Sequence, residues 1–126
     1  MTKCKKGNVI LTLFPDSNLK TAKKRPALVV QDDDLNTGLH QIIVALITSN
    51  LARAHHPSRV AVSRDSSEGS QSGLQLDSVI VADNLATIHT HFIHKVIGSL
   101  PTMDAVERAL AHTFGLKLAD GDREIG

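Results

Sequence analysis

Apolar residues fall into short runs separated by polar, turn-forming stretches, and this pattern predicts a mainly β protein. The run 8–14 (NVILTLF) and the segment 25–31 (RPALVVQ) predict two strands joined by a mobile cationic loop over 15–24. The apolar run within 40–50 (HQIIVALITSN) is too continuous for a half-exposed strand, so we expect a central strand covered on both faces. The remaining predicted strands are 59–63, 76–85 and 91–100.

A single helix is predicted over 103–114, with Thr102 as its N-cap and Gly115 as its end. We expect an apolar stripe on this helix to pack on the sheet. The stripe consists of Met103, Val106, Leu110 and Phe114.

Strands followed by one C-terminal helix suggest a small, strongly bent β-barrel capped by that helix. Segment 63–73 (SRDSSEGSQSG) is predicted to be a low-complexity loop. We expect a single domain over residues 1–116 and a frayed tail over 117–126.

Composition favours a cytoplasmic protein with an aliphatic core. The 126 residues are 41% hydrophobic, with no Trp, no Tyr and three Phe. The lone Cys4 cannot form an internal disulfide, and the early apolar run is too short for a signal peptide or membrane span. We expect no membrane association.

Charge is distributed unevenly along the chain although the net charge is only +1. Residues 1–25 contain seven basic residues and one acidic residue, a net charge of +6, whereas the remainder carries seven basic and twelve acidic residues, a net charge of −5. A one-sided positive field attracts polyanions, so the charge is compatible with a phosphate-bearing partner, and equally with lysines that only keep the terminus soluble.

Five segments in order, GNVILTLFP, KKRPALVVQ, ALITSN, LDSVIVADNLATI and KVIGSL, resemble the MazF/PemK family of toxin endoribonucleases. The resemblance spans Gly7 to about Leu116. It implies an SH3-like, PemK-type barrel, a homodimer, and sequence-specific, metal-independent cleavage of single-stranded RNA such as mRNA. It also implies neutralisation by a cognate antitoxin. The family's catalytic arginine and threonine correspond to Arg25 and Thr48.

Both residues suit RNA cleavage on chemical grounds. RNA carries its own nucleophile, the ribose 2′-hydroxyl, so the enzyme needs to orient it and stabilise a charged phosphorane, without a cofactor. Arg25 offers a planar fork of donors for phosphate oxygens, and Thr48 offers a hydroxyl that both donates and accepts. Because the pKa of arginine is above ~12, we expect Arg25 to act electrostatically rather than as a base.

Other polar residues are candidates for RNA contact. Asn84 replaces the glutamine usual in the family after Asp83, which shortens a base-contacting amide. Phe14 and Phe92 are left for base stacking, since Phe114 is assigned to the helix core. The predicted RNA-binding residues are Ser17, Asn18, Lys20, Lys23, Lys24, Ser49, Asn50 and Asn84.

Seven histidines form a competing set of functional residues. A histidine general base is a possible alternative, and His55 and His56 are the candidates because they follow Thr48 in the next loop. A metal site on His89 and His91 is disfavoured, because His94 would face the opposite side and no Cys lies nearby. We expect no metal. The other histidines are His40 and His112.

Two further classes remain open: a gyrase poison built on the same barrel, and a nucleic-acid-binding module that has lost activity. A gyrase poison would depend on its C-terminal helix instead of on Arg25 and Thr48. If the chain is a toxin, its antitoxin should present an acidic, apolar-interleaved segment that is disordered until it binds.

Overall fold

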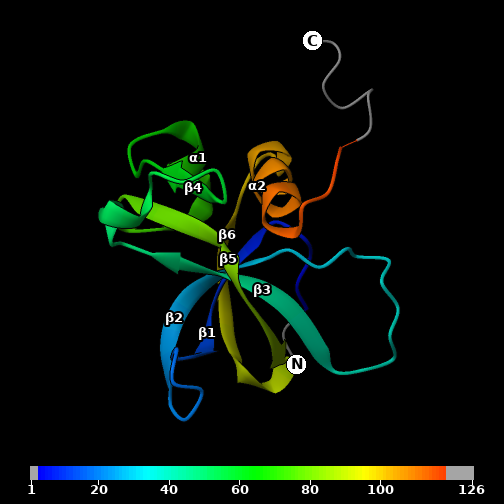
Figure 1. The fold of residues 1–126 in the computed structure, drawn as a ribbon. Helices are drawn as coiled ribbons and strands as arrows, with labels where there is room; N and C mark the ends of the chain where they lie inside the picture. The colour runs from blue at the N-terminus through cyan, green and yellow to red at the C-terminus, as the bar shows by residue number, and fades with distance from the viewer. Residues whose placement is uncertain (1–2, 119–126) are drawn as a thin grey trace.

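The computed structural model describes residues 3–118, which form six strands, two short 3-10 helices and two α-helices (Figure 1). In chain order the elements are β1 (Asn8–Pro15), β2 (Ala22–Val29), β3 (Gln41–Thr48), η1 (Leu51–Arg53), β4 (Arg59–Val62), α1 (Ser67–Ser72), β5 (Ser78–His89), η2 (Thr90–Phe92), β6 (Ile93–Ser99) and α2 (Asp104–Phe114). The prediction of a mainly β fold with a C-terminal helix is confirmed.

The strands form one antiparallel sheet in the order β4-β5-β3-β2-β1-β6. Both α-helices lie toward one end of the molecule, and the β1–β2 hairpin lies at the other (Figure 1). The sheet bends at β5, where Ala45 of β3 pairs with Leu85 but the next residue, Leu46, pairs with Val81. Extra residues on one strand bend the sheet in this way.

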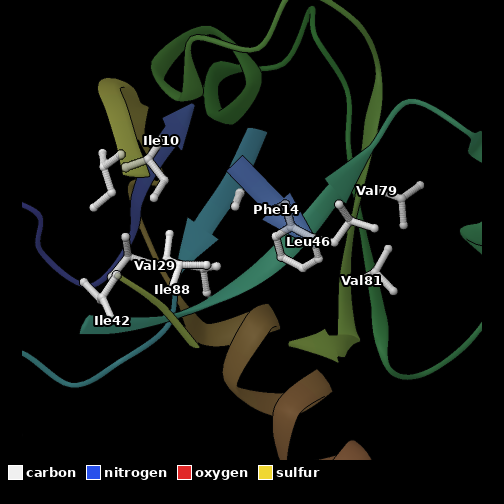
Figure 2. Packing of buried hydrophobic residues seen from close by; sticks show 11 residues of the cluster. Ile10, Phe14, Val29, Ile42, Leu46, Val79, Val81 and Ile88 are labelled. Atoms are coloured by element: carbon white, nitrogen blue, oxygen red, sulfur yellow. The ribbon is translucent and has the colours of Figure 1, made fainter. Parts of the chain in front are cut away.

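Each face of the sheet has its own hydrophobic core. Alternate residues of β3 serve the two cores: Val44 and Leu46 pack in one, Ala45 and Ile47 in the other. All four are at most 6% exposed, so the prediction of a central strand covered on both faces is confirmed. Figure 2 shows the first core, which takes residues from β1, β2, β3, β5 and β6.

For two of the three phenylalanines, the predicted burial was the reverse of the observed burial. Phe14 is 1% exposed and lies beside Leu46 in the first core (Figure 2), so it is not available for base stacking. Phe114 is 58% exposed, and its assignment to the helix core was wrong. The other three members of the predicted stripe, Met103, Val106 and Leu110, do pack in the core on the other face of the sheet, and the helix also buries Ala109 and Ala111.

The predicted ends of α2 were only partly right. Gly115 ends the helix in a left-handed conformation with φ of 66°, as expected. Met103, not Thr102, occupies the N-cap position, although the Thr102 hydroxyl accepts a hydrogen bond from the Asp104 N–H at 3.2 Å. Residues 119–126, most of the predicted tail, lie outside the described residues.

Segment 63–73 is not a continuous loop, because it contains α1. The Ser66 hydroxyl accepts the N–H of Gly69 at 3.0 Å and starts the helix, and Gly73 ends it with φ of 75°. Low complexity predicted a loop here, but the serine at position 66 is an N-cap. None of the helices within residues 3–118 has the length and apolar composition needed to cross a membrane.

The β1–β2 connection is shorter than predicted. Strand β2 begins at Ala22, so Lys23 and Lys24 lie on a strand and only residues 16–21 form the loop. Pro26 lies inside β2, where it pairs with Leu11 of β1.

Candidate active site

A cavity of about 520 Å³ opens where the apolar run of β3 becomes polar. Arg25 of β2 and Thr48 of β3 both line it. Its remaining walls come from β1, β6, the start of β5, Ser49, and segment 73–76 at the end of α1. The two residues predicted to be catalytic thus border one hollow, Arg25 from the middle of β2 and Thr48 from the end of the neighbouring β3.

The register of β2 and β3 explains why these two residues meet. The last ladder pair toward the cavity is Ala27 with Leu46. In an antiparallel pair each step back along one strand is a step forward along the other, so two more steps bring Arg25 opposite Thr48. Side chains at opposite positions project to the same side of a sheet.

Pro26 explains why the ladder ends before Arg25. The N–H of Val30 donates to the Ile43 carbonyl of β3 at 3.1 Å. N–H directions alternate along a strand, so the nitrogens of Leu28 and Pro26 also face β3. Proline has no N–H to donate, so pairing with β3 stops here. Pro26 and Ile47, its would-be partner, both line the cavity.

The Arg25 side chain is 34% exposed and is held by a carboxylate. Its Nη2 donates to Oδ1 of Asp16 at 2.7 Å, and the Thr21 hydroxyl donates to Oδ2 of the same carboxylate at 2.6 Å. These hydrogen bonds, from Thr21 first and Arg25 second, lower the pKa of Asp16 below its ordinary value of 3.8. Asp16 is therefore anionic at neutral pH.

The Thr48 hydroxyl accepts a hydrogen bond from the N–H of Asn50 at 3.1 Å. This bond fixes the oxygen at the rim of the cavity and leaves the hydroxyl proton to be donated. Thr48 therefore presents an oriented donor next to Arg25.

The charged residues that line the cavity are Lys24, Arg25 and Lys95, and within residues 3–118 no carboxylate is among its lining residues. Lys95 was missed by sequence reasoning. Its signal was a single lysine inside the otherwise apolar segment KVIGSL. Three cations around one hollow suit a polyanion.

Residues 5–114 match the family described as the PemK-like, MazF-like toxin of type II toxin-antitoxin systems. The chain belongs to this toxin family. The resemblance seen in the sequence motifs is therefore confirmed.

Relatives with known names agree with this assignment. The chain is 33% identical over 107 residues to endoribonuclease MazF2 of Mycobacterium bovis, an alignment covering 82% of this chain and 90% of the relative. It is 30% identical over 115 residues to endoribonuclease EndoA of Bacillus subtilis, covering 89% and 95% respectively.

Solved structures of family members share the fold. The Mycobacterium tuberculosis toxin MazF-mt6 matches with a TM-score of 0.69 at 23% identity, over 88% of this chain and 99% of that one. A mycobacterial endoribonuclease in complex with its cognate antitoxin matches with a TM-score of 0.70 at 23% identity, over 93% and 100%.

The predicted RNA-binding residues of this family member divide into two groups. Lys24 and Ser49 line the cavity. The others lie outside its lining, and two of them have structural roles: the side-chain Oδ1 of Asn18 accepts the Lys20 N–H at 2.8 Å, and the side-chain Oδ1 of Asn50 accepts the Ala52 N–H at 3.2 Å. The exposed members outside the cavity lining are Ser17, Asn18, Lys20, Lys23 and Asn50.

The structure brings neither His55 nor His56 into the cavity lining. The ring of His56 packs against that of His112 on α2, with ring centroids 5.7 Å apart. Its Nδ1 accepts the N–H of Ser58 at 3.1 Å. The loop after η1 thus directs His56 toward the helix.

A second group of histidines lies around η2. The ring centroids of His89 and His91 are 5.9 Å apart, and the ring of Phe92 lies near both. His40 lies 6.5 Å from His89. Within residues 3–118 no three His, Cys, Asp or Glu side chains are arranged to hold a metal ion.

Asn84 lies at the bend of β5 and is not among the cavity-lining residues. Its neighbour Asp83 receives two hydrogen bonds from Arg59, Nε to Oδ1 at 3.2 Å and Nη2 to Oδ2 at 2.9 Å. Arg59 is the first cause that lowers the pKa of Asp83. The Asp83–Asn84 segment is therefore anchored to β4.

Proposed function

We propose that this toxin is an endoribonuclease that cleaves single-stranded RNA in the cavity between β2 and β3. One observation carries the proposal: Arg25 and Thr48 come from separate strands and line one hollow with two lysines. The names of its relatives, endoribonucleases MazF2 and EndoA, support the same activity.

The proposed chemistry is transesterification by the RNA's own ribose. The 2′-hydroxyl gives up its proton to water as its oxygen attacks the adjacent phosphorus; a P–O2′ bond forms, the P–O5′ bond breaks, and the leaving 5′-oxygen takes up a proton from water. The products are a 2′,3′-cyclic phosphate and a 5′-hydroxyl end. Arg25 would donate N–H groups to the non-bridging oxygens as their charge grows, and Thr48 would donate its hydroxyl to the same phosphorane.

The cavity also offers contacts for the rest of the substrate. Lys24 and Lys95 would hold the phosphates that flank the cleaved bond, and these contacts are independent of base identity. Ser49 and Gln75 carry side-chain hydrogen-bonding groups at the lining and would contact base edges. Sequence preference would therefore depend on segment 73–76 as well as on the β1–β2 loop.

The same cavity would accept the antitoxin. Its lining combines cations with apolar surface from Leu11, Leu76 and Pro26, which suits an acidic segment with interleaved apolar residues. Such a segment would compete directly with RNA. A homodimer stays a prediction from the family.

The test is to incubate the purified protein with a labelled single-stranded RNA in EDTA. We expect cleavage with 2′,3′-cyclic phosphate ends in the wild type, and a rate about 100- to 1,000-fold lower for Thr48→Ala, the usual effect of losing one preorganised donor. Thr48→Ser, which keeps the hydroxyl, is the matched control and should retain most activity.

Three other outcomes would contradict the proposal. RNA binding without cleavage would indicate an inactive nucleic-acid-binding module, and neither binding nor cleavage would point to the gyrase-poison class. Cleavage abolished by EDTA would show that a metal is required. Sequencing the RNA ends would give the preferred cleavage sequence.

A further inference from the structure

The one acidic residue among the first 25 is bound to the one arginine of that segment. Residues 1–25 carry seven basic side chains, yet Asp16 contacts Arg25 at 2.7 Å. The Asp16 side chain is only 16% exposed, less than half the exposure of the Arg25 side chain. Solubility alone does not explain why the largely buried Asp16 lies beside Arg25, the group proposed to bind phosphate.

Loop 16–21 is built to hold this carboxylate in place. The N–H of Asp16 donates to the Thr21 carbonyl at 2.8 Å, and the Asp16 carbonyl accepts the N–H of Leu19 at 2.9 Å. Leu19 adopts φ of 60°, a backbone conformation that residues other than glycine adopt at an energetic cost. Asn18 closes the turn by accepting the N–H groups of Lys20 and Thr21.

We propose that Asp16 is a positioning residue that fixes the orientation of the Arg25 guanidinium for RNA cleavage. The inference rests on the proposed function above. Asp16 uses Nη2 of a group that has five N–H donors, so the remaining donors stay available to the phosphate. The Thr21 hydroxyl fixes the carboxylate from its other oxygen.

The same carboxylate repels the RNA. Its negative charge lies next to the cation that the substrate phosphate approaches, so it weakens ground-state binding. Asp16 therefore acts on two kinetic constants in opposite directions: orientation raises kcat, and charge raises KM. A merely structural residue would not separate the two effects.

Asp16→Asn and Asp16→Ala distinguish orientation from charge. Asparagine keeps an oxygen that accepts from Arg25, and its NH₂ group donates to the Thr21 hydroxyl, which accepts as readily as it donates. Alanine removes both the acceptor and the charge. Both variants should bind RNA more tightly, but only alanine should release the guanidinium.

The experiment measures kcat and KM on a short single-stranded RNA for the wild type and both variants. We expect Asp16→Ala to lower kcat about 10- to 100-fold, the effect of misplacing a catalytic group by about an ångström. KM should fall about two- to five-fold in both variants, and Asp16→Asn should restore kcat to within about three-fold of wild type. Thr21→Val, which leaves Asp16 present but held from one side, should lower kcat without lowering KM.

Asp83→Asn is the matched control, because it removes the charge of an aspartate paired with an arginine outside the cavity lining. It should leave kcat and KM unchanged. If wild type cleaves RNA but Asp16→Ala keeps a wild-type kcat, the positioning role fails while the proposed function stands. If Asp16→Asn loses as much kcat as Asp16→Ala with both folded by circular dichroism, the positioning role also fails. If wild type does not cleave RNA, both proposals fall.

Discussion

Two arginine–aspartate pairs occupy different parts of the molecule and are bonded differently. Arg59 gives two hydrogen bonds to Asp83 and a third, from Nη1, to the Arg53 carbonyl at 3.2 Å. Arg25 gives one hydrogen bond to Asp16 and borders the cavity.

The difference is the one expected between a structural guanidinium and one proposed to bind RNA. Arg59 uses its N–H donors within the protein, where its hydrogen bonds connect β4 and the end of η1 to β5. Arg25 is more exposed than Arg59, 34% against 22%, and keeps donors for a ligand. An arginine that is held but not saturated is suited to bind a phosphate in a fixed orientation.

The strongest way to break this comparison is to remove each arginine in turn. Arg25→Ala should lower the rate of RNA cleavage about 100- to 1,000-fold, because a preorganised donor is lost. Arg25→Lys should also be impaired, since one ammonium cannot serve Asp16 and a phosphate with the same planar geometry. Cleavage rates and thermal melting of the same preparations provide the measurement.

Arg59→Ala is the counterpart, and it should lower the melting temperature while folded protein keeps its cleavage rate. Equal loss of cleavage in the Arg25 and Arg59 variants, with both folded, would remove the distinction between the two pairs.

A smaller effect is expected from Gly73, which borders the cavity. Its φ is +75°, and an added Cβ would lie 2.0 Å from the Ile97 carbonyl oxygen. Gly38 has nearly the same φ, +76°, but an added Cβ would meet nothing within 4 Å. Gly38→Ala should therefore destabilise by about 1–2 kcal/mol through the backbone alone.

Gly73→Ala should exceed the loss of Gly38→Ala by about 1–3 kcal/mol because of the added clash. Urea unfolding of both variants measures the difference. Equal losses would mean that the wall formed by segment 73–76 moves freely away from β6.

The smallest effect concerns pH. The pKa values of Asp16 and Asp83 are both lowered in the folded protein, so each carboxylate stabilises the fold above its unfolded value near 3.8. That stabilisation is lost as pH falls through the lower folded pKa. Between pH 5 and 9 neither group changes charge, so neither should contribute to a pH profile there.

Thr21→Val sharpens this point, because the Thr21 hydroxyl is the largest cause of the lowered pKa of Asp16. In that variant the pKa of Asp16 should rise toward its ordinary value and that of Asp83 should not move. Carboxyl NMR titration measures both, and a common shift would indicate a global change instead.

Local patterns predicted much of the fold. The uninterrupted apolar run of β3 indicated a strand buried on both faces, and Gly115 indicated the end of α2, because both signals lie within a few neighbouring residues. Phe114 was misplaced for the opposite reason. Helical spacing identifies a stripe, but only tertiary packing decides how far along the helix the sheet extends.

The site was less accessible to sequence reasoning. Arg25 and Thr48 were predicted through motifs, and the register that brings them together is a simple consequence of antiparallel pairing. Asp16 and Lys95 were missed because their roles depend on a tight turn and on the position of β6. Pro15, Ser17 and Asn18 indicate a turn but not its contact with Arg25, and a single lysine before an apolar run does not show which other strands it faces.

The proline within β2 has a consequence for how a ligand would enter. The nitrogen of Pro26 carries no hydrogen at any salt concentration, temperature or degree of crowding. It therefore cannot donate a hydrogen bond that would close the gap between β2 and β3 when no ligand is bound. The site between the two strands would therefore already be open when an RNA strand arrives. Any delay before the first cleavage would then reflect movement of the RNA into the site and not an opening of the protein.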